Sequence, residues 1–189
     1  MSMFIGAAWA YMVVVAILLE PFGYSQKEIG YVSIVYCATG TIGGTIASLY
    51  IDYQLKLNIK PHYDILNKAF MTIGMAGILV KVLLIDVVND TWIIIFSGAI
   101  GFGLNSFLPL AIQCYVEKMF PCFELVLTTV MMQVSNLLGF ILNYILFLEV
   151  FHDCGLWVIL IILAPFYLYI IFFFKTKFRR FESEQVKQS

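Results

Sequence analysis

The chain has 189 residues, of which 62% are hydrophobic, 16% aromatic and only 12% charged. Because a soluble globular domain carries about twice this charged fraction, the composition excludes a soluble protein and predicts an all-α integral membrane protein in a lipid bilayer. The formal net charge of -1 leaves no basic excess, which excludes a nucleic-acid partner.

Six apolar runs are long enough to cross a membrane, which takes about 20 residues for a hydrocarbon core of about 30 Å. The first run has no basic region before it and is therefore predicted to be a span and not a cleaved signal. Together the runs predict a six-span bundle over residues 1–174, followed by a charged tail over 175–189. The predicted spans are 3–19, 29–51, 66–88, 91–116, 125–150 and 156–174.

Basic residues are unequally shared between the two ends of this bundle. Nine of the 11 lie at one end, namely Lys56, Lys60, Lys68, Lys118, Lys175, Lys177, Arg179, Arg180 and Lys187. The positive-inside rule makes this end, with both termini, cytoplasmic in a plasma membrane, or matrix-facing if the membrane is the mitochondrial inner one. Lys81 falls near the opposite end of the third run, where its stem is expected to snorkel outward.

The sequence gives little indication of a catalytic, cofactor or metal site. The sequence contains no nucleophile–base pair, phosphate loop or metal-spaced cluster, so neither an enzyme nor a cofactor or metal site is predicted. The histidines are expected on opposite sides of the membrane, and the cysteines, which lack CxxC spacing, are expected to pack as small apolar residues. These residues are His62, His152, Cys37, Cys114, Cys122 and Cys154.

Several amide side chains interrupt the apolar runs. Gln133 and Asn136 are three residues apart, and Asn105 and Gln113 are eight apart, so each pair shares one helical face. Lipid cannot hydrogen-bond an amide, and such groups therefore face either protein or a water-filled cavity. The pattern favours a transport path, with interhelical hydrogen bonds as the alternative.

The aromatic side chains Trp9 and Tyr11 in the first run also allow two interpretations. They can face lipid, or they can form the aromatic wall that a quaternary ammonium group binds through cation–π attraction. Three carboxylates, Asp52, Glu117 and Glu124, lie at the basic end beside helix termini. They are candidates for a cytoplasmic gate, with solvated surface charge as the alternative.

Three stretches carry a resemblance to a known family: Glu28-Ile29-Gly30 with 44–52, then 98–103 with 107–110, and then Val116 to Glu124 around Pro121. In these stretches the chain resembles the carboxyl-terminal half of a major facilitator superfamily transporter. More narrowly, it is similar to the family of the feline leukaemia virus subgroup C receptor. The last stretch, Val-Glu followed by Phe-Pro and a second Glu, is the most specific.

That resemblance implies transport of choline or ethanolamine, or export of haem, by alternating access. The family has twelve spans, so this chain would correspond to spans seven to twelve and would need a second six-helix half or other membrane subunits as partners. A family glutamine that faces the amine head group falls on Asn136, which keeps the carbonyl acceptor but is one methylene shorter.

The leading hypothesis is therefore a half-sized facilitator that moves a small organic cation or amine, or haem. Asn136, Gln133, Asn105, Trp9 and Tyr11 would line the substrate wall. The alternative is a transport-inactive half that serves as a structural subunit of a larger membrane complex.

Overall fold

The computed structural model describes residues 1–19, 23–84, 90–148 and 155–175, and these parts contain helices and no strands. The helices are α1 (Ser2–Leu19), α2 (Gln26–Lys56), α3 (Tyr63–Leu84), α4 (Asp90–Leu104), α5 (Phe107–Met119), α6 (Glu124–Leu146) and α7 (Gly155–Phe173). Five described stretches are long and apolar enough to span a membrane, and α1 adds a shorter apolar helix. The prediction of a multi-pass helical membrane protein is confirmed. His152, Cys154 and the tail from residue 176 lie outside the described residues.

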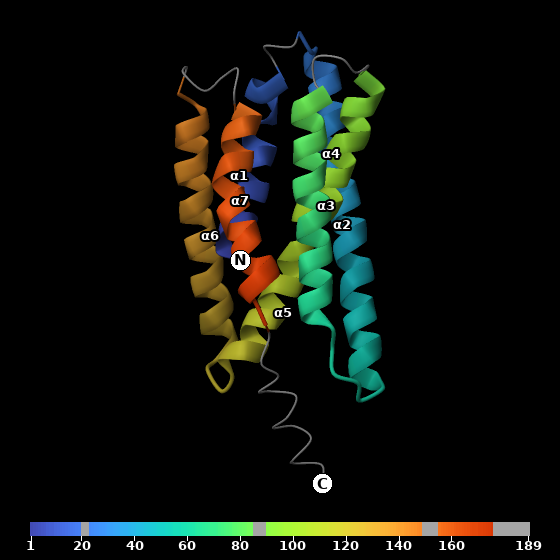
Figure 1. Ribbon diagram of the computed structural model, residues 1–189, viewed down its shortest axis with the longest axis vertical. Helices are drawn as coiled ribbons and strands as arrows, with labels where there is room; N and C mark the ends of the chain where they lie inside the picture. Colours follow the sequence, from blue (N-terminus) through green and yellow to red (C-terminus); the bar gives the residue numbers. More distant parts are fainter. Residues whose placement is uncertain (20–22, 85–89, 149–154, 176–189) are drawn as a thin grey trace.

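The helices form an elongated bundle in which successive helices run in opposite directions, except that α5 continues obliquely downward from α4 (Figure 1). Helices α1, α6 and α7 lie on one side, and α2, α3 and α4 lie on the other. The most extensive contacts pair α1 with α6, and α4 with both α2 and α3. Helix α5 crosses obliquely below them and leads the chain from the second group to the first.

Local signals fix both ends of α2. Ser25 Oγ accepts from the Glu28 backbone N–H, and a Glu28 carboxylate oxygen accepts in return from the Ser25 backbone N–H at 2.7 Å, a capping box that starts the helix. At the other end Asn58 adopts a positive φ of 55°, and the Ile59 N–H bonds back to the Gln54 carbonyl.

The chain between α2 and α3 is held by one buried amide. Gln54 Oε1 accepts from the His62 backbone N–H at 2.9 Å, which orients the amide so that its Nε2 meets His62 Nδ1 at 2.6 Å. Since the amide nitrogen donates, the imidazole accepts at Nδ1 and carries its proton on Nε2. The buried Gln54 side chain thus anchors the first residues of the next helix.

The predicted fourth span is divided into α4 and α5 at Asn105 and Ser106. Pro109 supplies the physical reason, because it has no N–H to give to the Asn105 carbonyl four residues earlier. That carbonyl accepts instead from the Leu108 N–H at 3.2 Å, a three-residue turn. Ser106 Oγ donates to the Gly40 carbonyl at 3.1 Å and fixes the break against α2.

Glycines allow backbone to meet backbone at two crossings. A Cβ atom on Gly6 of α1 would lie 2.8 Å from the Ser135 carbonyl oxygen and 2.9 Å from the Gly139 nitrogen of α6. A Cβ atom on Gly103 of α4 would collide with the backbone of Gly74 in α3. Small residues with this role are the usual means of close helix packing in membranes.

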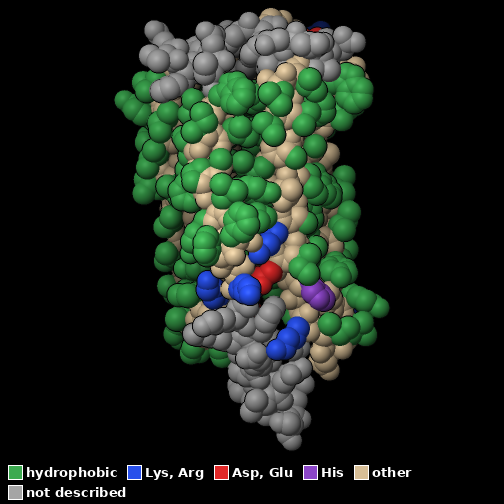
Figure 2. All heavy atoms as spheres, in the orientation of Figure 1, with side chains coloured by type: hydrophobic (Ala, Val, Ile, Leu, Met, Phe, Trp, Pro, Cys, Tyr) green, Lys and Arg blue, Asp and Glu red, His purple; other side chains and the backbone are tan. Residues whose placement is uncertain are grey.

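The exposed side chains differ in type between the middle of the bundle and its lower end. Apolar side chains cover the middle of the visible face, while blue lysines and a histidine gather at its lower end (Figure 2). Among the described residues, this end carries Lys56, Lys60, Lys68, Lys118 and Lys175. The asymmetry agrees with the unequal distribution predicted from the sequence.

Candidate functional site

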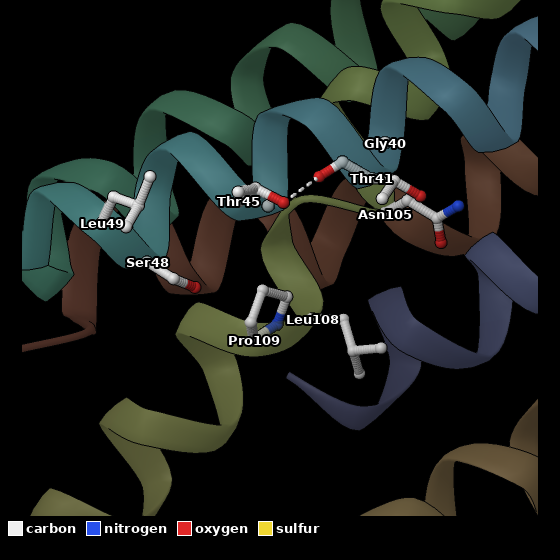
Figure 3. Close-up of a pocket in the computed structure, with 9 residues that line it drawn as sticks. Gly40, Thr41, Thr45, Ser48, Leu49, Asn105, Leu108 and Pro109 are labelled. Carbon is white, nitrogen blue, oxygen red and sulfur yellow. Dashed lines mark hydrogen bonds between the residues drawn. The ribbon is translucent and has the colours of Figure 1, made fainter.

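An open groove of about 510 Å³ lies between α2 and the break that separates α4 from α5 (Figure 3). Thr41, Thr45 and Ser48 line it from α2, and Asn105 and Pro109 line it from the other side. Thr45 Oγ1 donates to the Thr41 carbonyl at 2.9 Å, so this hydroxyl still has lone pairs for a solute. At the floor of the groove Gly40 and Gly44 let the break approach α2 closely, since a Cβ atom on Gly40 would collide with the Asn105 side chain and one on Gly44 would lie 3.4 Å from Pro109 Cγ.

The groove follows one side of α2, and the other side of this helix is apolar. Residues advance by about 100° along a helix, so Ile46 points about 100° or more away from Thr41, Thr45 and Ser48. Ile46 instead lines a separate depression with Ile65 and Leu66 near α3. Helix α2 therefore has a hydroxyl-bearing flank at Thr41, Thr45 and Ser48 and an apolar flank at Ile46.

Helix α6 also has sides of different chemical character. Its packing face centres on Ser135 and Gly139, which meet α1. Val134, two residues from Asn136 and thus on the opposite flank, lines a depression shared with α7. The flank away from α7 carries Thr129, Gln133 and Asn136, together with Phe140, which is 69% exposed. Gln133 and Asn136, predicted to share a face, both have exposed side chains.

Helix α1 lies between these two polar flanks. Gly6 meets α6, while the Ala8 carbonyl accepts a hydrogen bond from Tyr36 Oη of α2 at 2.9 Å. Between those two contacts α1 exposes Trp9, which is 46% accessible, together with Met12. We call the surface formed by the polar flank of α2, Trp9 of α1 and the polar flank of α6 the amide face.

Tyr11 does not belong to the amide face. It is 1% exposed, and its Oη accepts a 2.6 Å hydrogen bond from Lys81 Nζ of α3. The same amine donates to Ser97 Oγ of α4 at 2.8 Å, and it lies 5.2 Å from the Tyr11 ring centroid. Tyr11 therefore joins three helices inside the bundle, and its predicted place on an open substrate wall does not agree with its burial.

The outward snorkelling predicted for Lys81 is wrong, because this side chain is only 1% exposed. Side chains on a helix lean toward its amino terminus, and α3 begins at the opposite, lysine-rich end of the bundle. The stem of Lys81 therefore points back into the bundle. Sequence reasoning missed this cluster, because Tyr11 and Ser97 lie on the first and fourth predicted runs and nothing in the sequence pairs these runs with each other or with Lys81.

Three other amides lie deeper than those of the amide face. Asn67 of α3 is fully buried, and neither its Oδ1 nor its Nδ2 has a hydrogen-bond partner among the described residues. In the same part of the chain, Gln113 Oε1 and Asn143 Oδ1 are also buried without a partner. Asn105 and Gln113, predicted to share one helical face, are separated by the break before α5.

The three candidate gate carboxylates lie at the lysine-rich end but in different environments. Asp52 and Glu124 are exposed, the latter in the first turn of α6, where a carboxylate interacts favourably with the helix dipole. Glu117 in the last turn of α5 is only 6% exposed. A gate built on this end would therefore combine one inward-facing carboxylate with two solvated ones.

In comparisons with known proteins, no family model matches the sequence, and no curated protein matches it either. Within the described residues, no group of three or more His, Cys, Asp or Glu side chains is placed to hold a metal ion.

Proposed function

We propose that this protein is one half of a transporter of the major facilitator type, related to the feline leukaemia virus subgroup C receptor family, and that its amide face lines the substrate path. The observation that carries the proposal is the set of exposed hydroxyl and amide side chains on α2 and α6, namely Thr41, Thr45, Gln133 and Asn136, on two helices that both contact α1. Polar groups gathered on one side of a membrane bundle favour a water-filled path.

The chemistry of the face favours a small organic cation or amine. Helices α1 and α6 contain no Lys or Arg, and α2 has lysines only near its ends, so the face would not repel a positive charge. Amide and hydroxyl oxygens at Asn105, Asn136 and Thr45 supply acceptors, and the exposed indole of Trp9 supplies a cation–π surface. Choline and ethanolamine have this combination of charge and small size.

A six-helix half offers only one wall, so the second wall would come from another six-helix half or another membrane subunit that covers the amide face. The lysine-rich end would then face the cytoplasm or matrix. Asp52, Glu117 and Glu124 at that end would close the path against the partner.

The test is uptake of labelled choline and ethanolamine into vesicles that contain the chain with its copurifying partners. We expect Trp9→Leu and Asn136→Leu each to reduce uptake about tenfold, since either removes a contact with the cation. Ile161→Leu, at an exposed apolar position on α7, is the control and should retain uptake. Equal uptake by all three variants would remove the amide face from the path.

The alternative, a structural subunit, rests on the same open face, because a permanent partner could cover it without leaving a path. Native mass and stoichiometry distinguish the two. A fixed assembly with several unlike subunits and no uptake of either amine would support the structural subunit, whereas a two-half complex with uptake would support the transporter.

A further inference from the structure

A second depression, of about 500 Å³, lies toward the lysine-rich end between α5, α6 and α7, with Met1 and Ser2 at the start of α1 also lining it. Its wall is largely apolar, with Val130 and Val134 from α6, Phe166 and Tyr169 from α7, and Phe174 directly after α7. From Phe166 to Phe174 this lining covers nine residues, a length of about 12 Å at the helical rise. We call it the α6–α7 groove.

The α6–α7 groove is on the other side of α6 from the amide face. Val134, which lines it, is two residues from Asn136 and so about 200° away around the helix. A second half that covers the amide face would therefore leave this groove in contact with lipid. Its occupant can be argued separately from the transport proposal.

One end of the groove is cationic. Lys118 of α5 lines it and places Nζ 5.0 Å from the Phe174 ring centroid, a cation–π contact that positions the ammonium at the mouth. Lys175 follows directly after Phe174 and is exposed. One turn earlier on α7, the Ile171 carbonyl accepts from Lys68 Nζ at 2.8 Å, so three ammonium groups surround the end of this helix.

We propose that the α6–α7 groove binds one acidic phospholipid, with its phosphate beside Lys118 and an acyl chain along Val134 and Phe166. The apolar wall is long enough to hold much of a chain, and each buried methylene group contributes to binding. The lysines attract an anionic headgroup at the depth where headgroups lie. A zwitterionic lipid would contact the same apolar wall but would interact less favourably with the lysines at the end of the groove.

The test is native mass spectrometry of the full chain purified in detergent, with phosphatidylglycerol or phosphatidylcholine of identical acyl chains added. Phosphatidylglycerol is expected to remain bound at lower concentration than phosphatidylcholine. Lys118→Gln should weaken phosphatidylglycerol binding about fivefold, the usual effect of one basic residue at an anionic surface. Lys56→Gln, at the same end but on α2, is the matched control and should have no effect.

A second measurement uses the unaltered chain. Phosphatidylglycerol with a photoreactive acyl chain should label peptides from α6 and α7, and inorganic phosphate should not compete, because the acyl chain supplies much of the affinity. Equal binding of the two lipids, equal effects of Lys118→Gln and Lys56→Gln, or labelling confined to other helices would each overturn the proposal. Cross-linking of the groove to a second protein chain in native membranes would overturn it as well. None of these results depends on whether the chain transports an amine.

Discussion

Lys81 Nζ donates a 2.6 Å hydrogen bond to Tyr11 Oη, and both side chains are sealed inside a bundle built for lipid. Ser97 Oγ accepts the second bond of the amine and lies 3.3 Å from Tyr11 Oη. The three groups form a closed triangle that ties α1, α3 and α4 together. Because a buried polar group that loses its partner costs more than one removed altogether, the three positions should respond unequally to substitution.

Tyr11→Phe should destabilise the protein more than Lys81→Met does. The first substitution removes an oxygen from a buried amine and should cost about 2 kcal/mol. The second removes the amine and leaves two hydroxyls close enough to bond each other, at a cost below about 1 kcal/mol. Thermal unfolding in detergent of both single variants and the double variant would measure the coupling. A larger loss for Lys81→Met would show that the amine has a partner or role beyond this triangle.

Substitution of two glycines by alanine should have opposite effects on stability. Gly103→Ala would drive a methyl group into the backbone of Gly74, which cannot rotate away, so we expect a loss of about 3 kcal/mol or failure to assemble. Gly30→Ala meets nothing within 4 Å and should stabilise α2 by about 0.5 to 1 kcal/mol. Yield and unfolding midpoint in the same detergent report both effects, and similar midpoints would contradict the close crossing of α3 and α4.

The side chain of Gln54 should stabilise the segment between α2 and α3 more than the side chain of His62 does. Gln54→Ala removes both hydrogen bonds of the anchor, at a cost of about 1 to 2 kcal/mol, while His62→Ala keeps the bond from its own backbone N–H. Hydrogen–deuterium exchange across residues 57–62 is the measurement. Faster exchange is expected for Gln54→Ala, and equal exchange in the two variants would argue that the imidazole carries the anchor.

The amide face should be reachable from water, and the apolar flank of α2 should not. In a background without native cysteines, Thr45→Cys is expected to react with a membrane-impermeant maleimide at least tenfold faster than Ile46→Cys, although the two are neighbours in sequence. The measurement is the labelling rate in native membranes, with Lys56→Cys at the exposed end as the reference. Protection of Thr45→Cys to the level of Ile46→Cys would indicate lipid or protein against the groove.

Hydropathy was sufficient to locate the helices, because the number of apolar residues needed to cross a membrane is set by its thickness. Within the described residues each predicted run overlaps at least one helix, from α1 at residue 2 to α7 ending at Phe173. The break at Asn105 was missed because a single proline hardly changes the mean hydropathy of a run. Pro109 nevertheless stands in the sequence, and its lack of an N–H could have predicted the break.

Site residues were harder to place, since helical spacing shows which residues share a face but not where that face points. The spacing of Gln133 and Asn136 predicted a shared face, and both side chains are exposed. Trp9 and Tyr11 are two residues apart and so point in nearly opposite directions, one outward and one to Lys81. Only the neighbours of α1 decide which of the two is exposed, and those neighbours come from distant parts of the chain.

The meeting of Gly6 with Gly139 has a consequence for biogenesis. Helix α1 leaves the ribosome well before α6, yet its closest backbone contact is with that helix, made roughly 130 residues later, which takes on the order of ten seconds at usual rates of synthesis. During that interval α1 must remain at the translocon or beside a chaperone with its glycine surface uncovered. Truncated chains that end before α6 should therefore be prominent targets of membrane quality control.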